Sequence, residues 1–487
     1  MVNGIAMGAR AMMVVAVALA CWCGAEGEDN TPLRLGAEPV LFVDRSLIER
    51  ADGVELRLSK PERREVVLVT DRPWEGPQSA YFSVLRDGER ILLYYRGFCR
   101  TDLGEDQVTC VAESRDGITF TRPTVGLYDF AGSRENNIVH RGVESHNFAP
   151  FLDANPAAPP SERFKALGGV DGKLFAFVSE DGYRWRKLTD RPVLTEGAFD
   201  SLNVAFWDSK ARLYRCYSRA WTGGGYAGYR AIQSCTSRDF RSWTKPILNR
   251  YPAGVPDEHF YTNATTPCPD APGLLLSFPK RFVPERKRWQ DYPEPGVSDA
   301  VFMTSRDGVH WDRTFREAWL RPGRDPKNWT QRSNMPATGV IQTAPDEWSL
   351  YVTERYGWPD HRVRRVTVRR QGLASVHAGA AGGEFVTPVL RLEGEALVVN
   401  YATSAAGSLQ VEVQDEGGKP LPGYSLVEMA PLFGDEIARA VRWKSRADVS
   451  GARGRPVRLR FRLRDADLYA VSVQGSSASP VEYITNR

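Results

Sequence analysis

Five short segments of the sequence concentrate the side chains that could perform chemistry. Each combines carboxylates, amides, imidazoles or aromatic rings, and each stands directly ahead of an apolar stretch that is expected to form a strand. The segments are residues 74–77, 144–148, 199–203, 257–263 and 332–336. Carboxylates can supply acid and base, amides can hold hydroxyl groups, and aromatic faces can stack on sugar rings. If the five segments meet in the folded chain, their combined chemistry suits a carbohydrate.

Three carboxylates are the candidate catalytic residues, because cleavage of a glycosidic bond commonly uses a pair of them. Glu258 is the candidate general acid, since His259 and the aromatic neighbours are expected to raise its pKa. Asp200 is the second carboxylate, which would orient the sugar or tune the acid. Glu75, or alternatively Asp44, is the candidate base or nucleophile.

Polar side chains near these carboxylates are candidates for substrate binding. They are His146, Asn147, Asn203, His259, Asn263, Asn334, Arg96 and Arg281. For the two arginines and for Lys280, a structural role competes with contacts to an acidic sugar or a phosphate. His146 and Asn147 could equally form hydrogen bonds between neighbouring structural units. The sequence has no Cys-x-x-Cys or His-x-x-x-His spacing, so we predict no structural zinc site. No ligand set for another metal can be identified in the sequence, and no cofactor is predicted.

A repeated phrase indicates how the five segments are brought together. Ser-x-Asp-x-x-x-aromatic occurs four times at intervals of about 60 residues, at 114–120, 179–185, 237–243 and 305–311. Ser and Asp can bond nearby backbone amides in a tight turn, and the aromatic residue anchors the returning strand. The residues between the phrases alternate between apolar and polar in three strand-length stretches, which favours a four-stranded unit for each repeat. A fifth unit ends in a degenerate phrase at 370–373.

We therefore predict an all-β protein, in which a five-bladed β-propeller at 79–381 is followed by a β-sandwich at 382–487. Residues 26–78 are expected to be lead-in strands that close the propeller. Inner strands of a propeller begin at one mouth of its central channel. The five segments stand ahead of inner strands that begin near Tyr81, Ala149, Val204, Thr262 and Thr338. They should therefore converge at that mouth.

Five such units followed by a sandwich resemble the five-bladed propeller glycoside hydrolases of the β-fructosidase superfamily, families 32 and 43, and most closely a secreted bacterial branch of family-32-like proteins. The resemblance covers residues 70–487 and implies one carboxylate on each of three blades. Phe199-Asp200-Ser201 would take the place of the Arg-Asp-Pro motif, and Asp257-Glu258-His259 that of the Glu-Cys acid motif. The first blade departs from the pattern, because Asn-Asp-Pro-Asn-Gly is missing and Glu75 is the carboxylate nearby. Fructan specificity is therefore not implied.

The function that this resemblance implies is hydrolysis of an oligo- or polysaccharide by carboxylates at the propeller mouth. A sialidase-like enzyme is an alternative, although it would need six blades and three convergent arginines. A glycan phosphorylase would use Lys280 and Arg281 to bind phosphate. The non-enzymatic alternative is a carbohydrate-binding propeller that has lost its catalytic set.

Residues 1–25 have the layout of a secretory signal peptide, with Arg10 ahead of an apolar run and small residues after it. We expect an exported protein with no transmembrane segment in the mature chain, and Cys21 is a candidate for lipidation. The chain has 64 Lys and Arg residues against 60 Asp and Glu. With so small a net charge, no overall positive field favours binding of nucleic acid. The expected partner is a carbohydrate, and no oligomeric state is predicted.

Five cysteines follow the signal segment. Cys99 with Cys110, and Cys216 with Cys235, are pairs that could form cross-strand disulfides. Isolated buried thiols are the equal alternative, because free cysteine is among the most buried residue types.

Overall fold

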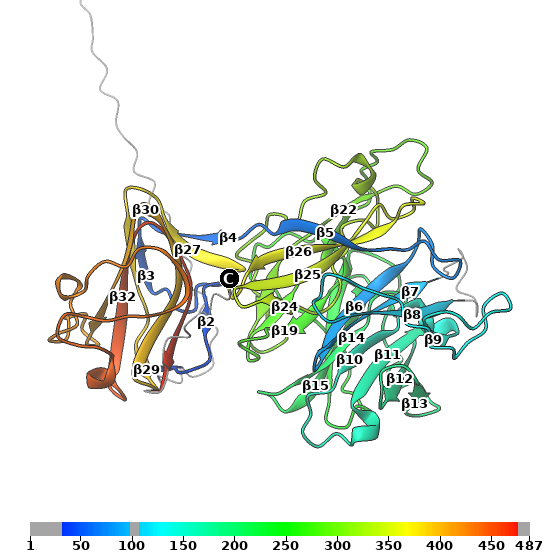
Figure 1. Ribbon diagram of the computed structural model, residues 1–487, viewed down its shortest axis with the longest axis horizontal. Helices are drawn as coiled ribbons and strands as arrows, with labels where there is room; N and C mark the ends of the chain where they lie inside the picture. The colour runs from blue at the N-terminus through cyan, green and yellow to red at the C-terminus, as the bar shows by residue number, and fades with distance from the viewer. Residues whose placement is uncertain (1–31, 98–106, 476–487) are drawn as a thin grey trace, which may run out of the picture.

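The computed structural model describes residues 32–97 and 107–475, and these form strands joined by turns and loops. The all-β character predicted from the sequence is confirmed. The signal segment, Cys21 and Cys99 lie outside the described residues. Two lobes are visible in Figure 1, and strands cross between them. Short 3-10 helices interrupt the described strands at Val143–His146, Pro160–Glu162, Pro326–Asn328, Leu426–Glu428 and Ser450–Ala452.

The larger lobe consists of small antiparallel sheets that follow one another along the chain. The first contains β6 (Ala80–Asp87), β7 (Arg90–Gly97), β8 (Val108–Ser114) and β9 (Ile138–Arg141). The second contains β10 (Ala149–Leu152), β11 (Phe164–Val170), β12 (Lys173–Ser179) and β13 (Arg186–Lys187). The third contains β14 (Val204–Asp208), β15 (Leu213–Trp221), β16 (Arg230–Ser237) and β17 (Ile247–Leu248).

The next part of the chain forms two three-stranded sheets. One contains β18 (His259–Thr262), β21 (Lys280–Val283) and β22 (Val297–Ala300), and the other β19 (Thr265–Pro267), β20 (Leu275–Ser277) and β23 (Met303–Ser305). The last sheet of the lobe contains β24 (Ile341–Ala344), β25 (Glu347–Glu354), β26 (Arg362–Arg369) and β5 (Glu62–Val69). Its outermost strand therefore comes from the N-terminal part of the chain.

The first strands of these sheets lie against one another. β6 contacts β10, β10 contacts β14, and β14 contacts β19. β24, from the last sheet, contacts β6, and an isolated parallel bridge joins Ser83 to Thr338. The last sheet therefore lies beside the first.

The Ser-x-Asp phrases form the turns that the sequence predicted. In the first turn, Asp116 Oδ1 accepts hydrogen bonds of 2.8 Å from the amides of Ile118 and Thr119. The carbonyl of Gly117, in the same turn, accepts a hydrogen bond of 2.6 Å from Tyr351 Oη on β25. This bond joins the first sheet to the last.

Two further turns make the same contact with the sheet that precedes them. Tyr94 Oη donates to the Gly182 carbonyl at 2.8 Å, and Tyr217 Oη donates to the Gly308 carbonyl at 2.9 Å. In the third turn Phe240 replaces the glycine, with φ at 61° in the left-handed region, and packs on Phe151 of the second sheet. The repeated turns therefore fasten neighbouring sheets together.

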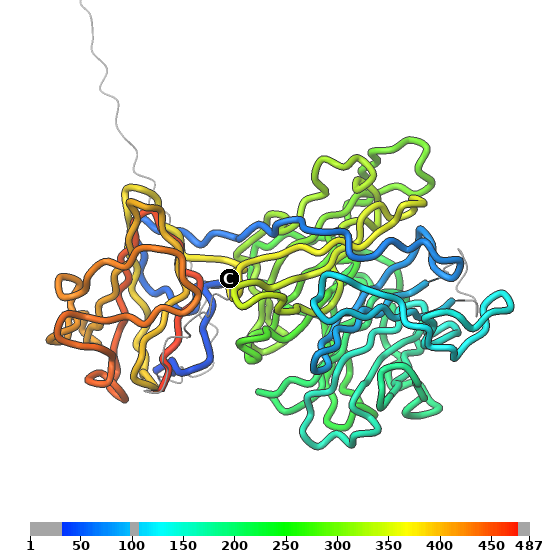
Figure 2. Tube along the Cα trace, viewed as in Figure 1, coloured from blue at the N-terminus to red at the C-terminus, as the bar shows by residue number. Residues whose placement is uncertain are grey.

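The smaller lobe is one ten-stranded sheet system, in which β30 and β32 pair along most of their length. Its strands are β1 (Leu33–Leu35), β2 (Val40–Leu41), β3 (Arg50–Asp52), β4 (Glu55–Leu58), β27 (Ala374–Ala378), β28 (Gly383–Val386), β29 (Leu390–Leu392), β30 (Ala396–Gln414), β31 (Asp435–Ala440) and β32 (Pro456–Gln474). Strands β1 to β4 of the lead-in segment thus pair with C-terminal strands, and only β5 joins the larger lobe. The tube in Figure 2 shows the N-terminal segment running from one lobe to the other.

Candidate active site

The ring of Tyr261, on β18, is surrounded by cationic side chains from three parts of the larger lobe. Arg219 and Arg230 come from the third sheet, Lys280 from β21, and Arg332 from the segment ahead of β24. Their distances from the ring centroid are 5.2 Å for Arg219 Cζ, 5.5 Å for Arg230 Cζ, 3.8 Å for Lys280 Nζ and 5.6 Å for Arg332 Cζ. Cations within about 6 Å of an aromatic face are attracted by its quadrupole. We call these four side chains the cation cluster.

Asp200 brings a carboxylate to the cation cluster. It forms an ion pair with Arg219, and its side chain keeps 30% of its surface exposed. Tyr81 joins the same group, because its Oη donates a hydrogen bond of 3.2 Å to the Asp200 carbonyl. The site therefore combines an accessible carboxylate with two phenols.

Tyr81 reaches this position through an irregular start of β6. Its φ is 56°, and the pairing of β6 with β7 shifts register between Ala80 and Ser83. A left-handed conformation is costly for a bulky residue, and such strain often occurs at functional sites. Arg96 Cζ lies 4.9 Å from the Tyr81 ring centroid, and the His146 ring lies 5.7 Å away.

The positive charge around Tyr261 affects its ionisation. Burial raises the pKa of this phenol, but Arg332, Arg219 and the hydrogen bond with Tyr81 outweigh that effect and lower it. Tyr94, which is equally buried but lacks such surroundings, has its pKa raised well above the ordinary value by burial. Tyr261 therefore gives up its proton more readily than Tyr94 does.

The pKa values of two basic groups of the site are lowered as well, which favours their neutral forms. Burial, followed by the charges of Arg332 and Arg230, lowers the pKa of Lys280 well below its ordinary value. Burial, followed by Arg96, lowers the pKa of His146 to about 2, so this imidazole is neutral near pH 7. Both shifts disfavour additional positive charge in the same region.

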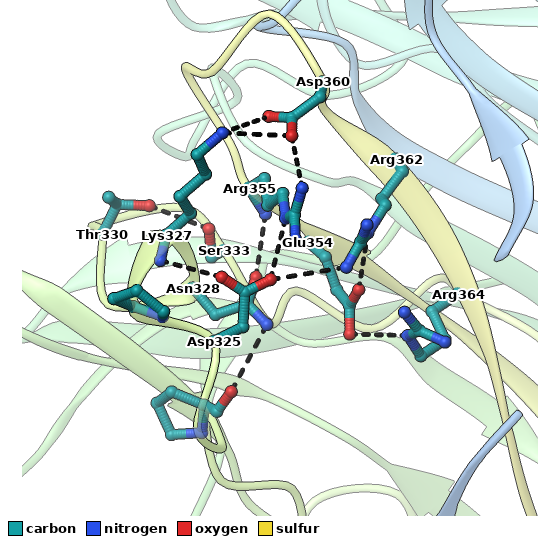
Figure 3. A network of polar contacts seen from close by, with 12 residues as sticks. Asp325, Lys327, Asn328, Thr330, Ser333, Glu354, Arg355, Asp360, Arg362 and Arg364 are labelled. Atoms are coloured by element: carbon teal, nitrogen blue, oxygen red, sulfur yellow. Dashed lines mark hydrogen bonds and ion pairs between the residues drawn. The ribbon is translucent and has the colours of Figure 1, made fainter.

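The segment that carries Arg332 is held by the network drawn in Figure 3. Arg355 Nε donates to Asp325 at 2.8 Å, and Lys327 Nζ lies 3.1 Å from Asp360 Oδ2. Thr330 and Ser333, on either side of Arg332, are hydrogen-bonded through their hydroxyls at 2.8 Å. Arg332 Nη1 then donates to Tyr356 Oη at 2.9 Å. The guanidinium is therefore placed by a loop that these polar contacts hold.

The structure places the other two predicted catalytic carboxylates in separate ion pairs. Glu75 is buried, bonded through both oxygens to Arg122, and accepts a hydrogen bond of 2.5 Å from Tyr95 Oη. Glu258 accepts hydrogen bonds of 2.8 Å from Arg281 and 2.7 Å from Arg313. Of the three predicted carboxylates, only Asp200 accompanies Tyr261.

The expectation that the pKa of Glu258 is raised was wrong. Burial raises it, but the hydrogen bonds from Arg313 and Arg281 outweigh burial and lower it. Strand alternation explains the placement, because successive side chains of β18 point to opposite faces. Glu258 and Phe260 face Arg313, whereas His259 and Tyr261 face Phe282.

The predicted asparagines are buried and bind backbone carbonyls. Asn147 Nδ2 donates to Gly169 at 2.8 Å, Asn203 to Phe199 at 2.9 Å, Asn263 to Leu202 and Tyr217 at 3.2 Å, and Asn334 to Ser298 and Asn328 at 2.9 Å. Asn263 and Asn334 thereby link neighbouring repeat units. Asn147 also donates to the Phe199 carbonyl ahead of the third sheet, which is the structural alternative that the sequence left open for this residue. Their amides hold the scaffold around the site.

The remaining predicted residues divide between the site and its surroundings. Arg96 Nη2 donates to the Gln78 carbonyl at 2.8 Å and lies beside Tyr81 and His146. His259 Nδ1 accepts from the Arg230 amide at 3.0 Å, at the edge of the cation cluster. Arg281 is held by both oxygens of Asp299 as well as by Glu258. Asp44, the alternative to Glu75, is paired with Arg306 near the smaller lobe.

Sequence reasoning did not single out Tyr81, Arg219, Arg230, Tyr261 or Arg332. Tyr261 and Arg332 stand inside two of the five predicted segments, and the phase of β18 would have favoured Tyr261 over Glu258. Arg219 and Arg230 lie near the ends of β15 and β16, on either side of a glycine-rich hairpin. No local pattern marks those two strand ends as part of the site.

A cleft of about 530 Å³ adjoins the cation cluster through Trp221. Arg230 Cζ lies 4.4 Å from the centroid of the Trp221 ring, and Tyr226 also lines the cleft. The lining also includes Ala198, two residues before Asp200. Aromatic walls with a few polar groups are typical of small-molecule sites.

No cluster of three or more His, Cys, Asp or Glu side chains suited to a metal occurs in residues 32–97 and 107–475. Over the same residues, no helix is long and apolar enough to cross a membrane. Cys110, Cys216, Cys235 and Cys268 are buried free thiols, although Cys216 and Cys235 stand opposite each other on β15 and β16.

No family model and no curated protein sequence matches this chain. Among solved structures, an N-acetylgalactosamine deacetylase from F. plautii, in complex with blood group B trisaccharide, has a TM-score of 0.42 at 13% identity, over 65% of this chain and 96% of its own. A thermostable family-43 glycoside hydrolase has a TM-score of 0.41 at 14% identity, over 63% and 96%. A β-1,2-mannobiose phosphorylase from Listeria innocua has a TM-score of 0.42 at 12% identity, over 65% and 98%.

Proposed function

We propose that this protein is an exported carbohydrate-active enzyme that cleaves a glycosidic bond at the site around Asp200 and Tyr261. The observation that carries this function is the meeting of an accessible carboxylate, two phenols and several cations contributed by different sheets. We further propose that the sheets of the larger lobe are the blades of a five-bladed propeller and that the smaller lobe is a β-sandwich. The contact of β24 with β6 supports that ring.

In the proposed reaction Asp200, ionised beside Arg219, acts as base and then as acid. It accepts the proton of Tyr261 Oη as that oxygen attacks the anomeric carbon and passes the proton to the leaving oxygen, so the bond to the leaving sugar breaks as the bond to tyrosine forms. Water, deprotonated by Asp200, then displaces the tyrosine and regenerates both groups. A tyrosine nucleophile is an established variation of the two-carboxylate scheme. The lowered pKa of Tyr261 supports this assignment.

A carbohydrate-binding protein without catalysis is the second candidate. It is favoured by Glu75 and Glu258, which arginines neutralise away from Tyr261. In that case Asp200 and the aromatic cleft would recognise a sugar without cleaving it.

The test is a screen of the purified protein against a broad oligosaccharide panel, followed by Asp200→Asn on any substrate found. General acid–base catalysis contributes about 10²–10⁴-fold, so kcat should fall at least 100-fold while substrate binding changes little. Asp208→Asn is the matched control, because Asp208 also pairs with an arginine of β15, Arg215, at 2.7 Å. Binding without cleavage, weakened in the Asp200 variant, would favour the non-catalytic candidate.

A further inference from the structure

The arginines of the cation cluster hold more positive charge than its carboxylate neutralises. Asp200 pairs with Arg219, but Arg230, Lys280 and Arg332 form no ion pair with any carboxylate of the described residues. Lys280 Nζ donates to the Gln331 carbonyl at 2.7 Å and Arg332 to a phenol, which are neutral partners. Buried charge without a counter-charge is costly, so a fold retains it where a ligand supplies the opposite charge.

The same side chains also leave hydrogen-bond donors unmet. The Nε atoms of Arg219, Arg230 and Arg332 are buried and have no hydrogen-bond partner within the described part of the chain. Arg219 is 4% exposed and Lys280 is fully buried. Buried donors are paired in the great majority of cases, so three unmet guanidinium donors around one ring indicate a missing acceptor.

We infer that Arg219, Arg230, Lys280 and Arg332 form a subsite for an oxyanion, namely a carboxylate, sulfate or phosphate group. This inference rests on the proposed function, to which it adds the class of substrate. The oxyanion is carried by an acidic sugar or is free phosphate that attacks in place of water. Guanidinium groups suit this ligand because their donors match two oxygens at once.

The neighbouring cleft has room for the rest of a saccharide. Trp221 lines the cleft and also lies against Arg230, so this ring joins the cleft to the cation cluster. Tyr226, whose side chain is 69% exposed, offers a second aromatic face 5.8 Å from Trp221 between ring centroids. Burial, followed by the charges of neighbouring arginines, lowers the pKa values of Lys280 and Arg230.

The test measures binding by calorimetry with three kinds of probe: trisaccharides containing glucuronate, mannuronate or galacturonate, their neutral methyl esters, and inorganic phosphate. At least one acidic probe should bind, and Arg230→Gln or Arg332→Gln should weaken it at least tenfold. The lysine variants Arg230→Lys and Arg332→Lys should recover part of the affinity, because they restore the charge. Phosphate that binds with the same arginine dependence would support the subsite and assign free phosphate as its source.

Arg163→Gln is the matched control, because Arg163 also lies over an aromatic ring, Phe164 at 4.9 Å, but beside Asp87 at the far end of β6 from Tyr81. It should leave binding unchanged, and thermal melts should show that all variants are folded. Methyl esters that bind as tightly as the acids, with no loss in the glutamine variants, would overturn the subsite and leave the proposed function standing. Failure of every oxyanion to bind would overturn it as well. Glycan cleavage that is absent although phosphate binds would instead refute the proposed function alone.

Discussion

Tyr261 differs from other buried tyrosines of this chain in the charge around its hydroxyl. Tyr94 and Tyr217 donate to turn carbonyls and have their pKa raised by burial, whereas cations and Tyr81 lower the pKa of Tyr261. A phenol in such surroundings is equipped to attack or to accept a proton, and one that holds a turn is not. Replacing Tyr261 and Tyr217 by phenylalanine should therefore have different effects on activity and on stability.

Removing only the hydroxyl tests this difference. Tyr261→Phe keeps the ring that the four cations contact, so we expect a folded protein whose kcat falls at least 100-fold. Tyr217→Phe is the control, because it loses the bond to Gly308 and should cost about 1 kcal/mol of stability with little change in kcat. Steady-state kinetics and urea melts of both variants decide the matter, and a Tyr261 variant of full activity would exclude a role in the chemistry.

Glu258 offers a pH-dependent test of its ion pairs. Because its folded pKa is lowered below 4.5, its contribution to stability is complete above about pH 4.5 and is lost as the pH falls through the folded value. Glu258→Gln should therefore cost about 1–3 kcal/mol at pH 7, and the difference from wild type should shrink at lower pH. Denaturant melts from pH 3 to 7 measure this difference in unfolding free energy. Loss of kcat at pH 7 in a folded variant would return Glu258 to the role of general acid.

The candidate site was only partly predictable at this scale. The segments that contain Asp200, Tyr261 and Arg332 follow from the repeat, because each stands ahead of a first strand. Which side chain of a segment faces the centre depends on strand phase, and an error of one residue exchanges Glu258 for His259 and Tyr261. Arg219 could not be predicted, because its contact with Asp200 depends on how the end of β15 passes the loop ahead of β14.

At the scale of elements, the Ser-x-Asp turns join the sheets as well as reversing the chain. Asp116 holds two amides and Ser114, and its pKa falls to about 2 because these hydrogen bonds outweigh burial. The neighbouring Gly117 carbonyl is thereby placed for Tyr351 on the last sheet. A local turn and a long-range contact are therefore coupled.

Asp116→Ala should weaken both the turn and the contact between the first and the last sheet. We expect a loss of about 1–2 kcal/mol in unfolding free energy, as for other side chains that cap backbone amides, with unchanged kcat. Arg115→Ala is the neighbouring control, since Arg115 is exposed and its replacement should change stability by less than about 0.5 kcal/mol. Urea melts compare the two, and equal stability would show that the turn forms without its carboxylate.

Element order was the most predictable feature of the larger lobe. The repeat interval and the alternation within it correspond to the sheets β6–β9, β10–β13 and β14–β17. Pairing between distant segments was harder, because nothing local in Leu33–Leu35 indicates that it lies parallel to Leu390–Leu392. The division of β18 to β23 into two three-stranded sheets was likewise not indicated by the repeat.

For the whole molecule, the N-terminal segment determines how the lobes are coupled. Leu41 and Phe42 are adjacent, but they enter different cores. Phe42 packs on Phe385 and Phe461 within the smaller lobe, with centroids 5.5 and 6.3 Å away. Leu41 belongs to a cluster that also contains Trp348 of the larger lobe. Because that cluster is shared, we expect the two lobes to unfold together.

Two alanine substitutions, compared by calorimetry, should distinguish the core of the smaller lobe from the core that both lobes share. Phe42→Ala leaves a cavity inside one lobe and should cost about 3–5 kcal/mol. Leu41→Ala should cost about 2–5 kcal/mol, and it should also split the single wild-type transition into two, because it weakens the core that both lobes share. Phe42→Ala should not split the transition, since its cavity lies away from the shared cluster. The contrary result is a wild-type protein that melts in two steps whose temperature difference Leu41→Ala leaves unchanged. That result would show that the lobes are thermodynamically independent.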